Sequence, residues 1–172
     1  MSEQISGKVW VLTDDTGRLI NNIDTDMIFH NRYLHITEVA EMGQYALDNL
    51  AGYEDFAKRV QPGEIVVTGA NFGCGSSRQQ AVDCFRALGI AALVAKSFGA
   101  IYFRNAVNAG FPVLCCPDLE PAALSTGDTA GLDLTTGSWH NATRDTALPP
   151  LTPVSTVQRQ IMQAGGLLKL KT

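Results

Sequence analysis

The chain has 172 residues, of which 45% are hydrophobic and 17% are charged. This composition excludes a disordered chain and is sufficient for one domain with a hydrophobic core, which we expect to span residues 1–172. The net charge of -4 and the lack of a basic run argue against a nucleic-acid partner. No apolar stretch reaches the roughly 20 residues that a membrane-spanning helix needs, so we expect no membrane contact.

The first third of the sequence predicts one strand and short helical pieces. Residues 7–12 are typical of a strand. The polar residues 21–26 are predicted to form a turn in which side chains bond to their own backbone, with metal binding by the two carboxylates as the alternative. Thr37 is expected to cap a helix that reaches about Leu50, and residues 53–59 predict a further short helical piece.

The central third predicts a strand, a glycine-rich loop, a helix and a second strand. Residues 64–68 are apolar and rich in β-branched side chains, which favours a buried strand. Residues 81–88 place apolar side chains at i, i+3, i+4 and i+7, which gives a helix one apolar face. Residues 90–95 form the next apolar run, and residues 69–78 are the loop between the first strand and the helix.

This loop, G-A-N-F-G-C-G-S-S-R, has the composition of an anion site. Its glycines let the backbone turn tightly and approach a ligand closely. A helix that begins near Ser76 or Ser77 would present unpaired amides and partial positive charge there. The guanidinium of Arg78 adds a planar group suited to a carboxylate or a phosphate. The alternative is that Ser76 only caps the helix and that Arg78 is a solvated residue of its first turn.

The last third predicts helix, strand, hairpin and helix. Residues 97–108 predict a helix and residues 111–116 a strand. Residues 127–136 and 139–143 predict two antiparallel strands joined by a short turn. Residues 154–164 predict the final helix, which a pair of glycines ends.

The cysteines Cys74, Cys84, Cys115 and Cys116 contain no C-x-x-C pair and predict no zinc or iron–sulfur site in this chain. Free thiols in a chain whose first residues do not resemble a signal peptide favour a reducing, cytoplasmic location. Cys84 falls on the apolar helix face and is expected in the core. Cys74 is expected to be a small loop residue, with a thiolate nucleophile as the alternative.

The loop motif together with N-I-D-T-D-M-I upstream and A-K-S-F-G-A-I-Y-F-R-N-A-V-N-A-G and A-G-G-L downstream resembles the small subunits of the isopropylmalate dehydratase group in the aconitase superfamily. The resemblance covers about residues 7–168. It implies an α/β fold of the aconitase swivel-domain type, with a β-barrel-like mixed sheet and flanking helices.

The resemblance also implies an activity and a partner. Such subunits dock on a separate large subunit that carries a 4Fe–4S cluster, while the small subunit itself holds no cofactor or metal. The assembled hydro-lyase moves a hydroxyl between adjacent carbons of a small di- or tricarboxylic acid through an alkene. We expect 3-isopropylmalate, a step of leucine biosynthesis, with homoaconitate or another substituted malate as the alternative.

The resemblance assigns roles within the loop. Ser76 is implied as the base in its alkoxide form, Arg78 binds a substrate carboxylate, and Ser77 assists. Relatives usually carry an acidic residue after the arginine, whereas this chain has Gln79 and Gln80, which puts an ion pair at Arg78 in doubt. Support of the loop is expected from Gly73, Cys74 and Gly75.

The segment Y-L-H-I at residues 33–36 is expected to reach the variable arm of the substrate. Relatives that act on homocitrate-type acids resemble Y-L-R-T there, and those that act on isopropylmalate place an apolar residue at the third position. His35 fits neither pattern, although neutral it can pack on an isopropyl group and protonated it can hold a carboxylate. Ile36 is expected to make the site more apolar, which favours isopropylmalate. The alternative is a surface histidine without substrate contact.

Two other classes of protein stay open on the residues alone. A phosphate- or nucleotide-binding module would need a P-loop lysine or a dinucleotide glycine pattern, and G-C-G-S-S-R contains neither. A non-catalytic assembly subunit would be expected to lack Ser76 or Arg78, and both are present.

Overall fold

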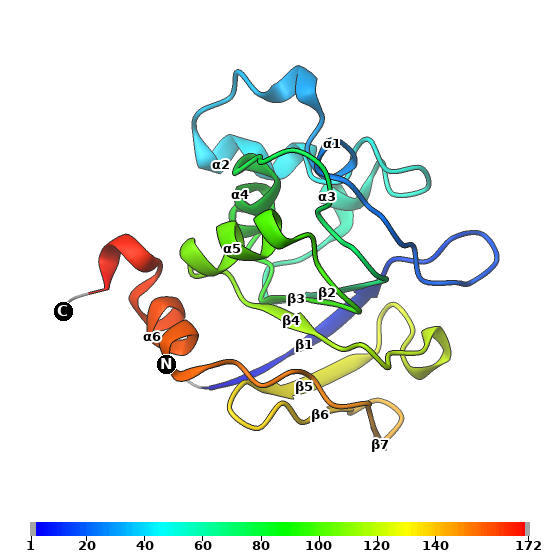
Figure 1. The fold of residues 1–172 in the computed structure, drawn as a ribbon. Coiled ribbons are helices and arrows are strands. Elements are labelled where there is room, and N and C mark those ends of the chain that lie inside the picture. Colours follow the sequence, from blue (N-terminus) through cyan, green and yellow to red (C-terminus); the bar gives the residue numbers. More distant parts are fainter. Residues whose placement is uncertain (1–2, 171–172) are drawn as a thin grey trace.

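A mixed β-sheet forms the frame of the protein in a computed structural model that describes residues 3–170 (Figure 1). Its strands are β1 (Gln4–Val11), β2 (Ile65–Thr68), β3 (Ala92–Ala95), β4 (Val113–Cys115), β5 (Thr129–Asp133), β6 (Trp139–Asn141) and β7 (Thr146–Ala147). Their spatial order is β4-β3-β2-β1-β5-β6-β7. Strands β1 to β4 run parallel and β5 to β7 antiparallel.

The long strand β1 joins the two halves of the sheet. Its second half pairs with β2, with Val9 opposite Ile65, and its first half pairs with β5, with Ile5 opposite Leu132. One strand therefore pairs with a parallel neighbour along one part of its length and with an antiparallel neighbour along another. In Figure 1 the strands β5 to β7 curve round beneath the parallel strands, so that the sheet closes into a half-barrel.

Helices flank the sheet. They are α1 (Thr25–Ile28), α2 (Val39–Met42), α3 (Phe56–Arg59), α4 (Gln80–Ala87), α5 (Ala100–Asn108) and α6 (Thr156–Ala164). In Figure 1, α4 and α5 lie above β2 to β4, and α6 lies beside the start of β1. There Arg159 Nε pairs with Glu3 Oε1 at 3.2 Å. This arrangement confirms the predicted mixed sheet with flanking helices.

The alternation of side chains along the strands divides the apolar residues between two cores. Val9 and Val11 of β1 point into the half-barrel, where they pack with residues of β5 and β6 such as Leu132 and Trp139. Trp10, between them in the sequence, points the other way and packs with the helices. Successive side chains of a strand face opposite sides, so both faces of the sheet are buried.

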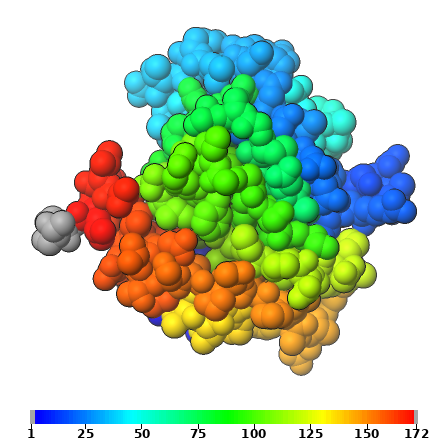
Figure 2. Space-filling view, viewed as in Figure 1, coloured from blue at the N-terminus to red at the C-terminus, as the bar shows by residue number. Residues whose placement is uncertain are grey.

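Two segments project from this body in the space-filling view (Figure 2). One is the turn around residues 14–18, and the other is the segment after α6, where Leu168 is fully exposed. Within residues 3–170, no helix has the length and apolar character needed to cross a membrane.

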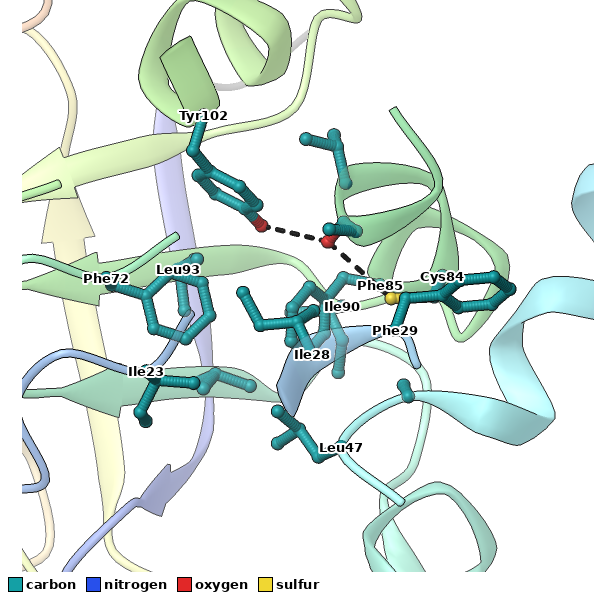
Figure 3. Packing of buried hydrophobic residues seen from close by; sticks show 14 of the residues in the cluster. Ile23, Ile28, Phe29, Leu47, Phe72, Cys84, Phe85, Ile90, Leu93 and Tyr102 are labelled. Carbon is teal, nitrogen blue, oxygen red and sulfur yellow. Dashed lines mark hydrogen bonds between the residues drawn. The ribbon is translucent and has the colours of Figure 1, made fainter. Parts of the chain in front are cut away.

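An aromatic cluster lies beneath the start of α4 and α5 (Figure 3). The rings of Phe72 and Tyr102 meet edge to face with centroids 5.2 Å apart, and Phe85 lies against Phe72 at 6.1 Å. The Tyr102 hydroxyl donates to the carbonyl of Ala81 at 3.2 Å, which binds α5 to the first turn of α4. Cys84 is buried in the same cluster, as its helix face predicted.

The helix expected from Thr37 to about Leu50 is wrong in its length and its cap. The chain instead forms α2, with Glu38 at its N-cap position but without a side-chain capping bond, and then a 3-10 turn, Gly43–Tyr45. Gly43 packs so closely on α4 that a Cβ would lie 3.2 Å from the side chain of Leu88. Close packing on α4 therefore decides the local structure here, while helix propensity does not.

The helix expected at residues 97–108 begins later, at Ala100. The hydroxyl of Ser97 does not cap it, because this hydroxyl accepts a hydrogen bond from the backbone amide of Asn71 at 2.8 Å. The predicted strands at residues 64–68, 90–95 and 111–116 are confirmed as β2, β3 and β4, each shorter than expected. The final helix is confirmed, with Ser155 as its cap.

Candidate active site

The predicted anion site lies in the serine loop, residues 69–79, which joins β2 to α4. It starts at the carboxyl end of β2, the edge at which ligands bind in parallel sheets. Its backbone is bonded on both sides: the amide of Phe72 donates to the Ser97 carbonyl at 3.1 Å, and the amide of Gly73 donates to the Ile23 carbonyl at 2.8 Å. The loop is therefore held between two other connections of the sheet.

Two glycines of the serine loop are required by its geometry. Gly73 has a φ of +76°, and a Cβ there would lie 2.2 Å from Cγ of the buried Tyr102. Gly75 has a φ of +101°. Between them Cys74 is half-buried, and its carbonyl accepts from the amide of Thr25 at 2.9 Å. These glycine conformations and the bond to Thr25 fix the path of the loop.

The two serines lie outside the helix that was expected to begin at them. The helix α4 begins at Gln80, so the predictions of a helix start near Ser76 or Ser77 and of a Ser76 cap are wrong. Both serine side chains are exposed. Ser76 Oγ lies 3.3 Å from Oγ1 of the buried Thr25, and Ser77 Oγ accepts from Asn105 Nδ2 at 3.4 Å.

Arg78 is largely buried, with 11% of its side chain exposed. Its Nη1 donates to the Phe29 carbonyl at 2.7 Å, to Asp26 Oδ1 at 3.1 Å and to the Thr25 carbonyl at 3.3 Å. The alternative of a solvated first-turn residue is therefore wrong. Within residues 3–170 no hydrogen bond engages Nε or Nη2, so one edge of the guanidinium remains available to a ligand.

Asp26 of α1 supplies the ion pair that Gln79 and Gln80 placed in doubt. Burial by itself raises the pKa of this carboxyl, but the hydrogen bonds from Arg78 and from the Asn31 amide outweigh that effect and hold the pKa below its usual range. Asp26 is therefore ionised at neutral pH. The Gln79 side-chain amide is directed to α4, where it donates to Asp83 Oδ1 at 3.2 Å.

Sequence reasoning missed Thr25 and Asp26 as parts of this site. The available signal was the N-I-D-T-D motif, and the predicted self-bonded turn accounts for only part of it. Asp24 confirms that prediction, because its Oδ1 accepts from the Met27 amide at 2.8 Å and caps α1. Thr25 and Asp26 then face the serine loop.

His35 lies on the loop between α1 and α2, after the 3-10 turn Asn31–Tyr33. Its side chain is exposed, and Nδ1 lies 3.0 Å from the carbonyl of Arg32. In the described part of the chain no hydrogen bond joins it to the serine loop. Ile36 does not contribute the apolar surface that was expected, because its side chain packs in the core; the apolar neighbour that reaches the surface is Leu34, 40% exposed.

The cysteines do not fit an iron–sulfur cluster. Burial raises the pKa of all four thiols. The pKa of Cys116 is raised to about 11, with a contribution from the nearby Asp118 carboxylate. The Asp24 carboxylate adds to the raised pKa of Cys74. Across residues 3–170 no three His, Cys, Asp or Glu side chains gather closely enough to hold a metal ion.

Together these groups have the chemistry that one half of an anion site needs. An exposed hydroxyl, Ser76, stands beside a buried hydroxyl and a buried guanidinium with one free edge. Such an edge binds a carboxylate through two parallel hydrogen bonds. An exposed hydroxyl can exchange a proton with a molecule bound beside it.

A comparison with known proteins identifies the family to which this chain belongs. The aconitase C-terminal domain matches residues 15–117, which include α1 and the serine loop. The chain therefore belongs to the aconitase C-terminal domain family.

Individual relatives of this chain carry more specific names than the family does. The 3-isopropylmalate dehydratase small subunit of Lachnospira eligens is 39% identical over 169 residues, covering 98% of this chain and 94% of that protein. The 3-isopropylmalate dehydratase small subunit 1 of Archaeoglobus fulgidus is 38% identical over 163 residues, covering 95% and 94%. The crystal structure of 3-isopropylmalate dehydratase (leuD) from Methanocaldococcus jannaschii superposes with a TM-score of 0.83 at 30% identity, covering 97% of this chain and 92% of that one. The resemblance and the fold predicted from the sequence are confirmed.

The packing of Gly73 predicts a specific loss of stability. In Gly73→Ala the new Cβ overlaps the buried ring of Tyr102, whereas Gly17→Ala has a similar φ of +81° and nothing within 4 Å of its Cβ. We expect Gly17→Ala to lower the free energy of unfolding by about 1 kcal/mol through backbone strain. Overpacking adds about 1–3 kcal/mol in Gly73→Ala. Urea denaturation of both variants measures the difference, and equal losses would contradict the packing assigned to Gly73.

Proposed function

We propose that this chain is the small subunit of a heteromeric, cytoplasmic hydro-lyase that interconverts 2-isopropylmalate and 3-isopropylmalate in leucine biosynthesis. The observation that carries the proposal is the half-site at α1: a buried guanidinium with one free edge beside an exposed serine hydroxyl. The relatives of this chain carry the name of that enzyme's small subunit, which supports the same function.

The proposal assigns the remaining half of the site to a large subunit. Ser76 and Ser77 are exposed at the surface of this chain, so the substrate needs a second wall. The thiols here do not fit a cluster, and we place the 4Fe–4S cofactor in the large subunit. This chain then supplies the base and the carboxylate-binding group, and neither nucleic acid nor membrane takes part.

Ser76 acts as the base. Its Oγ, as the alkoxide, takes the carbon-bound proton of the substrate, so that the C–H bond breaks and an O–H bond forms on the serine. The electron pair of the C–H bond forms the alkene as the C–O bond of the adjacent carbon breaks and its hydroxyl leaves towards the large subunit, whose cluster would supply the Lewis acid for it. The serine returns the proton when water is added back. A serine serves as a base only where its alkoxide is stabilised. The Thr25 hydroxyl, 3.3 Å away and fixed by burial, can donate to that oxygen, and Arg78 adds positive charge two residues along.

Arg78 orients the substrate. Its Nη1 is committed to α1, so the opposite edge, Nε and Nη2, has a fixed direction in which to receive a carboxylate. The Ser77 hydroxyl accepts from Asn105 and can direct its own proton at the same carboxylate. Two donors from adjacent residues thereby position the carbon that Ser76 deprotonates.

Substrate selection falls to the exposed pair Leu34 and His35, which we call the loop tip. Leu34 offers apolar surface to an isopropyl group, and neutral His35 can pack beside it. Protonated His35 would favour a carboxylate, which makes homoaconitate or another substituted malate the competing assignment.

The function is tested by assembly. The purified chain, the large subunit encoded with it and their mixture are incubated anaerobically with 3-isopropylmalate, and the two isomers are separated by chromatography. We expect isomerisation only in the mixture and no iron–sulfur absorbance from this chain alone. Turnover by the isolated chain, or a stable complex that converts no substituted malate, would overturn the proposal.

Removal of the base should mainly lower kcat. In the assembled enzyme Ser76→Ala is expected to reduce kcat by about 10²–10⁴-fold, the usual contribution of a general base, with KM changed little. Ser77→Ala removes a hydroxyl of the same size from the next residue and should act mainly on KM. A Ser76→Ala enzyme with near-normal turnover would show that the serine is not the base.

Replacement of His35 at the loop tip by arginine should change the preferred substrate. His35→Arg introduces a charge that can pair with the extra carboxylate of homoisocitrate. We expect kcat/KM to favour 3-isopropylmalate in the wild type and to shift by about tenfold or more towards homoisocitrate in the variant, since a close charge pair contributes at least about 1.4 kcal/mol. A wild type that already prefers homoisocitrate would refute the substrate assignment, and an unchanged ratio in the variant would refute the role of His35.

A further inference from the structure

The loop tip is held between two anchors. Before it, Tyr33 ends the 3-10 turn Asn31–Tyr33, and after it Ile36 is buried in the core. The amide of Ile36 donates to the carbonyl of Tyr33 at 2.9 Å, which closes a tight turn across Leu34 and His35. In Figure 1 this segment is the light-blue connection at the top, between α1 and α2. The direction of the tip therefore depends on what fixes Tyr33.

Tyr33 is fixed by a hydroxyl contact and a ring contact. Its hydroxyl donates to Asp48 Oδ2 at 2.6 Å. Its ring stacks on that of Tyr45, with centroids 4.0 Å apart and an angle of 18° between the planes. The other oxygen, Asp48 Oδ1, is buried and has no hydrogen-bond partner among residues 3–170. The Tyr33 hydroxyl is therefore the one group in that part of the chain that satisfies the Asp48 carboxylate.

The segment that presents Asp48 is strained and firmly held. Leu47 has a φ of +62°, unusual for a residue with a branched side chain, and is fully buried. Its amide donates to the Ile28 carbonyl at 2.9 Å, and the side chain of Asn49 donates to the Asp26 carbonyl at 3.2 Å. A residue stays in such a strained conformation only where the surrounding contacts hold it there. Here the surroundings are α1, the helix that Arg78 binds.

We propose that Asp48 and Tyr33 form a latch that sets the direction of the loop tip and thereby the enzyme's discrimination between substrates. Both are positioning residues, because Tyr33 adjoins the tip, Asp48 holds Tyr33, and neither is assigned a contact with the substrate. The inference rests on the proposed function for its second half, the choice of substrate. Its first half, the fixed conformation of residues 34–36, concerns this chain alone.

A matched pair of variants separates the hydrogen bond from the ring stack. Tyr33→Phe keeps the stacked ring and removes the hydroxyl, which leaves the Asp48 carboxylate buried without its donor. Tyr45→Phe makes the same chemical change on the other ring of the stack, whose hydroxyl bonds to no described residue. Both variants retain every apolar contact of the cluster.

The latch is measured in two ways. Hydrogen exchange of the full chain reports on the backbone amides of residues 34–36. The assembled enzyme gives the ratio of kcat/KM for 3-isopropylmalate to that for a malate with a smaller alkyl arm. We expect Tyr33→Phe to speed exchange and to lower the ratio, each by about tenfold, the scale of a hydrogen bond to a charged group. Tyr45→Phe should match the wild type in both.

The outcomes are distinct. A Tyr33→Phe enzyme whose ratio stays within about twofold of the wild type, or whose two kcat/KM values fall equally, would overturn the latch as a device for discrimination. Equal effects of Tyr45→Phe would show that loss of either hydroxyl disturbs the ring pair and would overturn the specific role of Asp48. If the wild-type assembly converts neither substrate, the proposed function fails, and exchange at residues 34–36 still decides whether the latch exists.

Discussion

The three hydrogen bonds that Arg78 Nη1 makes to α1 are the constraint on which the site depends. A guanidinium that is only 11% exposed needs a counter-charge and acceptors for its buried Nη1 donors. The ionised Asp26 and two helix carbonyls provide these, and they bind the serine loop to α1 at the same time. Thr25, which faces Ser76, and the chain that leads to His35 are placed by that same helix.

This constraint explains the division between buried and exposed groups. Thr25 and Arg78 are largely buried, and of these two only the free edge of Arg78 is assigned to the substrate, while Ser76 and Ser77, which are also assigned to contact it, are exposed. The half-barrel and the aromatic cluster beneath Gly73 supply a rigid base for both sets. A folded chain with an open half-site is what a subunit that completes its active site on a partner requires.

The regular elements could be predicted because their signals are local. Apolar periodicity placed β2, α4 and β3 correctly, and the hairpin of β5 and β6 followed from its turn residues. The start of α4 could not be predicted, because Ser76, Ser77 and Arg78 resemble a cap and a first turn. A contact between Arg78 and Asp26, far apart in the sequence, draws that stretch out of the helix. Ile36 was misplaced for the same kind of reason, since only the tertiary packing shows that it faces the core.

The most direct test of the account is a structure of the assembled enzyme with a bound substrate or an unreactive dicarboxylate analogue. We predict that Nη1 of Arg78 keeps its contacts with Asp26 and the Phe29 carbonyl while Nε and Nη2 bind a ligand carboxylate, and that Ser76 Oγ faces the carbon to be deprotonated. An Arg78 side chain that leaves α1 to reach the ligand, or a carboxylate bound entirely by the large subunit, would contradict it.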